Sequence, residues 1–382
     1  MNDDDAMRIE DFELERFFAR YEFAVRHLLC ASDVEGWAMA DLLVLADPET
    51  AALWHGLGLG YTEAPGHPLL RAEIATLYEG IAPDEVVVFS GAEEAIFATL
   101  NVLLGPGDHA IVVWPSYQSL YAIARAAGAD VTLHELRAAD GWSIDLGLLR
   151  RQVTPRTKVI VVNVPHNPTG ALPDVATYRA VADIAAEAGA TLLSDEVYRF
   201  LEIDPLDRLP AGAEVGPHGV SVGVMSKSFA LAGLRIGWLA SHDTRLLDAA
   251  ARFKDYTTIC ASAPAEILAL IALRARDAVL ARSRSIVDAN LVLLDGFFAR
   301  RPDQFGWVRP RGGSIGFPEL RAGVPIDRFA EDLVAAEGVL LAPGSIFGHP
   351  GNHFRIGYGR TDLPAALAGL ESFADRTLGR QA

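Results

Sequence analysis

The strongest constraint on the fold is an alternation, between residues 55 and 260, of short apolar runs with longer stretches of helical spacing. The runs are rich in β-branched residues and lie at residues 85–89, 110–114, 158–163 and 191–195. A strand buried on both faces is apolar throughout, and parallel strands need helical crossovers. We therefore predict an α/β fold with a mostly parallel, helix-covered sheet in a large domain over residues 55–265.

The rest of the chain predicts two smaller units. Residues 8–28 mix apolar and charged positions at helical spacing, which indicates an amphipathic helix in an N-terminal arm. We expect this arm, residues 1–54, to pack on a small α+β domain formed by residues 266–382. A chain of 382 residues suits one large and one small domain. The elements expected in the small domain are one long helix or two abutting helices over 262–300, and strands near 313–318 and 353–358.

Composition limits the partners and the compartment. The formal net charge is −17 and no basic cluster is present, so we expect no nucleic-acid partner. No apolar run is long enough to cross a bilayer, and the N-terminus reads Met-Asn-Asp-Asp-Asp, so we expect a cytoplasmic protein without a membrane partner. Cys30 and Cys260 lie far apart without metal-ligand spacing, which predicts neither a disulfide framework nor a metal site.

Residues 224–238 place Lys227 among small residues, with Arg235 eight positions downstream. A lysine amine reacts with a carbonyl only if its pKa is lowered or if it is held as an imine. The planar, always charged guanidinium of Arg235 suits a phosphate. An aldehyde and a phosphate on one cofactor indicate pyridoxal 5′-phosphate (PLP). The alternative is an ordinary surface lysine beside a buried arginine.

Three further segments follow predicted strands, where open α/β sheets bind their ligands. The turn at Gly91 opens a helix whose free amide groups favour a phosphate, although such a turn also serves as a simple cap. Asn167 lies in a segment with Asn-Pro turns, which hold a polar side chain rigidly or form a plain turn. Asp195 can keep a ring nitrogen protonated, and its alternative is a helix-capping aspartate.

The combination of these motifs resembles the class I and II aminotransferases. The resemblance rests on Asn-Pro-Thr-Gly at 167–170, Asp195 with Tyr198, and Ser226-Lys227 with Arg235, in this order and spacing. It extends from Tyr61 to Arg355 and so covers nearly the whole chain. The family has the type I fold of PLP enzymes, which implies a large cofactor-binding domain and a smaller C-terminal α+β domain.

The resemblance also implies a role for each matching residue. Lys227 would hold the cofactor as an aldimine and move the substrate Cα proton, with Asp195 on the pyridine nitrogen and Tyr198 as the third catalytic residue. Arg355 would bind the substrate α-carboxylate beside Asn167, unless it is a strand arginine in a surface ion pair. The remaining cofactor contacts would be Gly91, Ala92, Glu93, Ser226 and Arg235 at the phosphate, Asn167 and Tyr198 at the ring oxygen, Tyr117 against the ring, and Tyr61 from the other subunit of a homodimer.

Two segments depart from the family pattern. Val224 stands three residues before Lys227, where many relatives place a serine or threonine that contacts the phosphate. The loop at residues 30–39, Cys-Ala-Ser-Asp-Val-Glu-Gly-Trp-Ala-Met, replaces a glycine-rich segment that helps to recognise substrate in the family. The phosphate contacts therefore depend more on Arg235 and Ser226, and the usual substrate assignment does not carry over.

The resemblance implies an aminotransferase that moves an amino group between an L-amino acid and a 2-oxo acid. Residues 310–318, 338–348 and the loop at 30–39 are similar to capreomycidine synthase and its relatives. The alternative is therefore a PLP-dependent lyase or cyclase that acts at Cβ or Cγ of an arginine-derived amino acid. Asp33 and Glu35 would then contact the guanidinium, unless they are solvated loop carboxylates. A PLP-binding sensor domain is a third hypothesis, and the short acidic stretch before Tyr61 argues against it.

Overall fold

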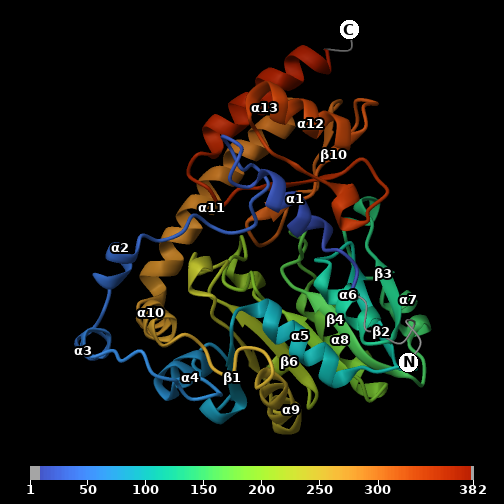
Figure 1. Ribbon diagram of the computed structural model, residues 1–382. Helices are drawn as coiled ribbons and strands as arrows, with labels where there is room; N and C mark the ends of the chain where they lie inside the picture. The colour runs from blue at the N-terminus through green and yellow to red at the C-terminus, as the bar shows by residue number, and fades with distance from the viewer. Residues whose placement is uncertain (1–8, 380–382) are drawn as a thin grey trace, which may run out of the picture.

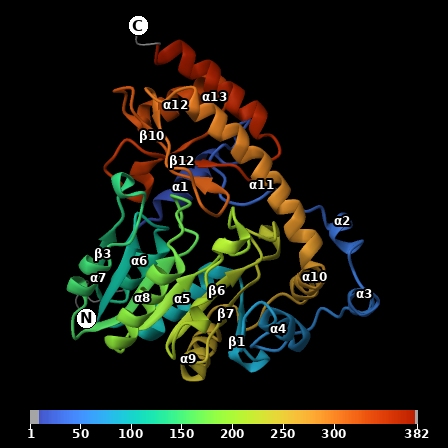
Figure 2. The same cartoon turned by 180° about the vertical axis from the view of Figure 1, so that it is seen from behind.

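The structure, a computed structural model, describes residues 9–379 and has two parts (Figure 1). The larger part contains a sheet flanked by helices, and the smaller part carries the C-terminal helices. Viewed from behind in Figure 2, the long helix α11, Arg276–Ala299, runs from the larger part into the smaller one. The expected pair of a large α/β unit and a smaller α+β unit is present.

The central sheet has seven strands in the order β1-β7-β6-β5-β4-β2-β3. The five strands from β6 to β3 pair in parallel, whereas β7 runs antiparallel to both of its neighbours, β1 and β6. The prediction of a mostly parallel sheet is confirmed. The strands are β1 Val86–Phe89, β2 His109–Trp114, β3 Asp130–Glu135, β4 Thr157–Asn163, β5 Thr191–Asp195, β6 Gly219–Val224 and β7 Gly237–Ala240.

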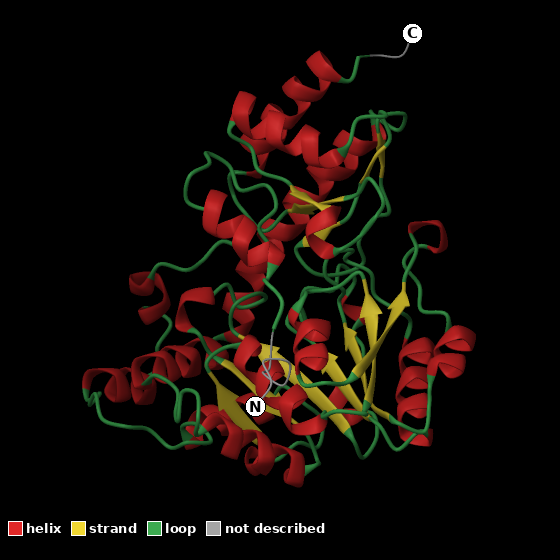
Figure 3. Cartoon of the chain, turned by 45° about the vertical axis from the view of Figure 1, so that its right-hand side comes forward, coloured by secondary structure: helices red, strands yellow, loops and turns green. Residues whose placement is uncertain are grey.

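Helices cover both faces of this sheet (Figure 3). In β4, Val159 and Val161 pack in one apolar cluster with α5, α6 and α9, whereas Ile160 and Val162 pack with α8 in another. Because both faces are dry, the strand is apolar throughout, which is the pattern read from the sequence. The helices of the first layer are α5 Ala92–Leu103, α6 Ser119–Ala126 and α9 Thr244–Lys254; those of the second include α4 Pro68–Ala75, α7 Leu146–Gln152 and α8 Val175–Glu187.

The predicted N-terminal helix is shorter than residues 8–28. Helix α1 spans Glu13–Tyr21, and residue 8 lies outside the described residues. The chain leaves helical geometry after α1 because the backbone amides of Arg26 and His27 both donate to the Gly338 carbonyl of the small part. This tertiary pairing competes with further helix formation, since an amide bonded there is not available to the preceding turn. The other helices of the arm are α2 Met39–Leu43 and α3 Pro48–His55.

The smaller part packs around one apolar cluster. Its helices α11, α12 and α13 cover two small antiparallel sheets, β10-β8 and β11-β12-β9. Two abutting helices occupy the predicted helical stretch, because α10 ends before α11 begins. The elements are α10 Ala263–Arg274, β8 Phe305–Gly306, β9 Ile315–Gly316, β10 Glu319–Leu320, α12 Ile326–Glu337, β11 Ala342–Pro343, β12 Phe354–Gly357 and α13 Leu363–Thr377.

Apolar packing suggests a domain border later than residue 265. Helix α10 and Val279 of α11 pack with the large part, whereas Val287 and the later residues of α11 pack with the small part. We therefore propose that the border lies within α11.

The described residues also bear on the other structural expectations. No helix within residues 9–379 is long and apolar enough to span a membrane. Cys30 is a buried free thiol and Cys260 is a half-buried one. In the same part of the chain, no three His, Cys, Asp or Glu side chains are grouped so that they could hold a metal ion.

Candidate active site

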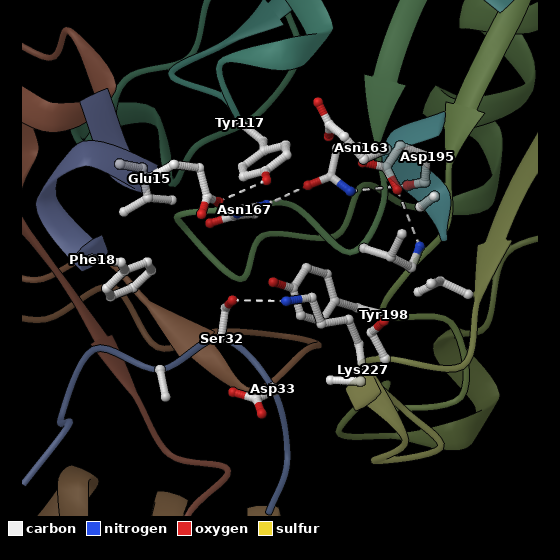
Figure 4. Close-up of a pocket in the computed structure, with 18 of the residues that line it drawn as sticks. Glu15, Phe18, Ser32, Asp33, Tyr117, Asn163, Asn167, Asp195, Tyr198 and Lys227 are labelled. Carbon is white, nitrogen blue, oxygen red and sulfur yellow. Dashed lines mark hydrogen bonds between the residues drawn. The ribbon is translucent and has the colours of Figure 1, made fainter. Parts of the chain in front are cut away.

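A cavity of about 360 Å³ lies over the carboxyl ends of the central strands, beneath helix α1 (Figure 4). Its volume is in the range of small-molecule sites. Asn163 and Asp195 reach it from the last residues of β4 and β5, and Val224 from the end of β6. Parallel strands end at a common edge, which is why residues far apart in sequence meet here.

Most of the predicted site residues line this cavity. Asp195, Tyr198 and Lys227 are there, as are Tyr117 and Asn167, and Figure 4 shows these side chains turned toward one another. The other predicted residues on its wall are Asp33, Ala92, Glu93, Ser226 and Arg235. The predicted residues that are not among the described lining residues are Glu35, Tyr61, Gly91 and Arg355.

Lys227 is the lysine of the cavity. Its Nζ donates to the Ser32 hydroxyl at 2.9 Å, and burial lowers its pKa, so that a larger fraction of the amine is neutral and nucleophilic. The sequence contains two further lysines. Lys158 is exposed, and the Nζ of Lys254 is bound by the carbonyls of Ala64 and Val88 at 2.7 Å each. Only Lys227 combines a lowered pKa with access to the cavity.

Asp195 lies at the bottom of the cavity with 3% of its surface exposed. Burial raises the pKa of its carboxyl to about 7, and one carboxylate oxygen accepts a hydrogen bond from the Val197 amide at 3.2 Å. An ionised carboxylate here lacks a cationic hydrogen-bond partner among the described residues. A protonated ring nitrogen would supply that partner and would return the carboxylate to its charged form.

Two polar groups are positioned for a ring oxygen. The Tyr198 hydroxyl is buried and has no hydrogen-bond partner within residues 9–379. The backbone amide of Asn167 donates to the side chain of Asn163, which in turn donates to the Asp195 carbonyl at 3.0 Å. This contact fixes the Asn167 backbone at the end of β4. A buried hydroxyl without a partner is costly, so the open donor of Tyr198 indicates a ligand oxygen.

The opposite end of the cavity suits an anion. Gly91 has φ +90°, and a Cβ added to it would lie 2.5 Å from Nη2 of Arg235, so the glycine is required for the close approach of the guanidinium. Helix α5 begins at the next residue, Ala92, with its free amide groups at this end. Arg235 also donates to the Ala232 carbonyl at 3.1 Å. These groups fit a phosphate.

Glu93 adds an acidic side chain to the same end. Burial raises the pKa of its carboxyl to about 7, so at neutral pH a larger share of it is protonated than of an exposed glutamate. In the family resemblance, Glu93 contacts the phosphate through its backbone amide and not through its side chain. A partly neutral carboxyl group is compatible with an anion nearby, whereas a fully ionised one would repel it.

Arg355 lies just outside the cavity wall and is completely buried. Its Nε donates to the Cys30 carbonyl at 3.1 Å, and its Nη1 donates to Oδ1 of Asn167 at 3.3 Å. The guanidinium lies over the rings of Phe18 and Phe347, at 5.7 and 5.3 Å. Nη2 has no hydrogen-bond partner in the described part of the chain. This free donor on a buried cation is suited to a carboxylate, and the alternative of a surface ion pair is excluded by the burial.

The carboxylates of the unusual N-terminal loop are already bound within the protein. Both oxygens of Asp33 accept from Nη2 of Arg360, at 3.0 and 3.1 Å. Glu35 accepts from the Thr361 backbone amide at 2.8 Å and from its hydroxyl. Asp33 therefore lines the cavity as half of an ion pair, and Glu35 is directed to the small part of the molecule.

Four polar residues of the cavity were not predicted from the sequence. Asn163 and Ser32 had partial signals, because one ends a predicted strand and the other lies in the unusual loop. Glu15 lies on α1, Glu22 directly follows this helix, and both line the cavity. Nothing in the helical pattern distinguished them from the other charged residues of α1.

The comparisons with known proteins agree with this geometry. The family model described as aminotransferase class I and II matches residues 40–365. The chain belongs to this family. Among curated proteins, it is 30% identical over 381 residues to capreomycidine synthase of Streptomyces vinaceus, which covers 98% of this chain and 96% of that protein.

Two solved structures are similar over the same extent. A PLP-dependent aminotransferase from Streptococcus suis superposes with a TM-score of 0.91, at 32% identity, covering 97% of this chain and 98% of that one. The PLP-dependent cyclase OrfR gives a TM-score of 0.88, at 33% identity, with coverage of 97% and 98%. The protein is a PLP-dependent enzyme of fold type I, and the cavity has the donors and acceptors that PLP needs.

The raised pKa of Asp195 predicts a pH-dependent stability of the apoprotein. With a folded pKa of about 7 against an unfolded value near 3.9, the native state binds more protons between about pH 4 and 7, so stability falls as the pH rises through this range. At pH 8 the buried charge costs on the order of 4 kcal/mol. Asp195→Asn should therefore raise the melting temperature of the apoprotein at pH 8 by on the order of 5 °C, although it removes activity.

Scanning calorimetry of both apoproteins at pH 5 and pH 8 checks this prediction. The advantage of the variant should shrink by more than half at pH 5, where Asp195 is protonated in the folded state. Added PLP should stabilise the wild type more than the variant. An advantage of the same size at both pH values would show that the carboxyl is not held as described.

Proposed function

We propose that this enzyme is an aminotransferase that moves an amino group between an L-amino acid and a 2-oxo acid. The observation that carries the proposal is a pair of groups: the amine of Lys227 in the cavity, whose pKa is lowered by burial, and the guanidinium of Arg355 just outside the cavity wall. Arg355 is bonded to the lining residue Asn167 and keeps a free donor. A substrate bound through its α-carboxylate at Arg355 presents its Cα to Lys227. Both an amino acid and a 2-oxo acid carry this carboxylate, so one arginine serves both half-reactions.

The residues around the substrate have separate tasks in this mechanism. When bound, PLP supplies an electron-accepting ring that stabilises negative charge on the substrate Cα. The Asp195 carboxylate would keep the ring nitrogen protonated, and Tyr198 and Asn167 would hold the ring oxygen. Lys227 takes the Cα proton and returns it as a general base and acid. Ser32 accepts no proton in this scheme; its hydroxyl orients the Lys227 amine.

A second candidate function is favoured by the relatives that match over the full chain. Capreomycidine synthase and OrfR, named as a cyclase, both match over at least 97% of this chain. Removal of the same proton by Lys227 leaves an electron pair at Cα that can expel a leaving group from Cβ, whereas loss of a group from Cγ needs a second proton to be removed from Cβ. The alternative is therefore a lyase or cyclase reaction on an arginine-derived amino acid, which needs no 2-oxo acid.

An assay with and without a 2-oxo acid separates the two functions. The purified holoenzyme is incubated with L-amino acids and 2-oxoglutarate or pyruvate, and in parallel with Cβ-hydroxylated arginine alone. The proposal predicts one glutamate or alanine formed for each amino acid consumed. Product from the hydroxylated arginine without an acceptor, and no amino transfer, would contradict it and support the cyclase.

Arg355→Lys gives a matched test of the carboxylate contact. Lysine lacks the planar fork, so the KM values for the amino acid and for the oxo acid should both rise by about 10- to 100-fold. Arg309→Lys, at a half-exposed arginine paired with Asp295, is the control and should leave both values unchanged.

We further propose a homodimer in which Tyr61 reaches the cofactor of the other subunit. Tyr61 is 90% exposed, and its loop is tied to the segment before α10 by a hydrogen bond from Thr62 to the Ala261 carbonyl. Large apolar side chains are exposed nearby in sequence on both segments, namely Leu59 and Tyr256. A second copy of the chain would cover them.

Light scattering tests the assembly. The expected particle has twice the chain mass of 41.0 kDa, and Tyr61→Ser should weaken PLP binding by about tenfold through the loss of one hydrogen bond. Leu206→Ser, at an equally exposed position on a distant loop, is the control. A 41.0 kDa particle with full PLP affinity would contradict the dimer.

A further inference from the structure

Helix α1 places two carboxylates over the active-site cavity. Glu15 lies on α1 and Glu22 caps its C-terminal end, and both line the cavity with Asp33. Figure 4 shows Glu15 and Asp33 on the side of the cavity that faces away from Asp195.

The two glutamates differ from Asp33 in having no cation bound to them. Asp33 is neutralised by Arg360 at 3.0 Å. Within residues 9–379, no lysine, arginine or histidine lies within salt-bridge distance of Glu15 or Glu22. Glu15 accepts only the Tyr117 hydroxyl, at 3.1 Å, and no side-chain hydrogen bond of Glu22 is present in the same part of the chain. The cavity thus has an excess of negative charge at its outer side.

The three carboxylates line one cavity and are close enough to affect the titration of Glu22. The pKa of Glu22 is raised by its burial and by the neighbouring charges of Asp33 and Glu15, and the more distant charges of Arg360 and Lys227 offset only part of this rise. A bound cation would relieve this repulsion and lower the pKa of Glu22 again. The inner side of the cavity also contains the buried hydroxyl of Tyr198, which has no partner among residues 9–379. Polar groups without a protein partner therefore lie at both the inner and the outer side of the cavity.

Helix α1 is fixed well enough to hold this charge in place. The Glu13 amide donates to the side chain of Gln118 at 2.9 Å, and that side chain donates to the Asp11 carbonyl at 2.7 Å. The rings of Phe12 and Tyr117 pack at 4.9 Å. The contacts anchor α1 on the segment after β2, and Tyr117 is thus in contact with both the cavity and Glu15.

We propose that Glu15 and Glu22 bind the cationic side chain of the substrate, which is therefore an amino acid with a guanidinium or ammonium group. The inference rests on the proposed binding of an amino acid at Lys227 and Arg355, and it holds for amino transfer and for cyclisation alike. The α-carboxylate binds Arg355, the reacting carbon lies at Lys227, and the side-chain cation lies beneath α1. An acidic substrate side chain would be repelled by the same carboxylates.

Arginine and citrulline provide the sharpest test because they have nearly the same shape and differ in charge. Each is added to the holoenzyme without an acceptor, and binding is measured from the change in the visible cofactor band and from the thermal shift. Arginine should bind about 10- to 100-fold more tightly than citrulline, the range for a charge-assisted hydrogen bond. Ornithine should resemble arginine, and aspartate should bind most weakly.

Variants assign this preference to the two residues. Glu15→Gln with Glu22→Gln should reduce the ratio of arginine to citrulline affinity to below about fivefold. Glu13→Gln, on the same helix but outside the cavity lining, should leave the ratio unchanged. Equal binding of arginine and citrulline to the wild type, or an unchanged ratio in the double variant, would overturn the inference while the proposed function stands. A cofactor band that responds to no amino acid would contradict the proposed function as well.

Discussion

The site depends on the parallel direction of β4, β5 and β6, whose carboxyl ends meet at one edge of the sheet. This constraint brings Asn163, Asp195 and the segment before Lys227 together across 64 residues of sequence. The strands are held in this register by apolar packing on both faces, so the chemistry of the edge rests on a core that contains none of the reacting groups. Antiparallel β7 then returns the chain so that Gly237 contacts Gly91, and a Cβ on it would lie 2.5 Å from the Gly91 carbonyl carbon.

The polar groups of the site are arranged to bind a ligand, and this arrangement lowers the stability of the apoprotein. The Tyr198 hydroxyl and one nitrogen of Arg355 are buried without partners in the described chain, and burial shifts the pKa of Asp195 toward neutrality. Each of these features destabilises the empty fold and is relieved by a cofactor or substrate group of complementary charge. The interactions that contribute most to binding are therefore those with the ring nitrogen and ring oxygen of the cofactor and with the α-carboxylate of the substrate.

Much of this arrangement was predictable from the sequence, for physical reasons. Asp195 and Asn167 follow apolar runs, and the end of a parallel strand is where a ligand binds, so their place in the cavity followed from the pattern. The contacts and positions of the carboxylates at the outer side of the cavity could not be predicted in the same way. Under the cyclase alternative, Asp33 and Glu35 would contact the substrate guanidinium, with solvated loop carboxylates as the other interpretation. In the structure Arg360 and Thr361 of the small part bind them. Glu15 and Glu22 reach the cavity because α1 docks across it, which depends on tertiary contacts that helical periodicity does not record.

Covalent binding of the cofactor aldehyde by Lys227 can be tested by direct labelling, because the chain has only three lysines. The holoenzyme is reduced with borohydride, digested with a protease that does not require lysine, and its peptides are analysed by mass spectrometry. The cofactor mass should appear only on the peptide that contains Lys227. Modification at Lys254, the other lysine whose pKa burial lowers, or at Lys158, with Lys227 left unmodified, would contradict it.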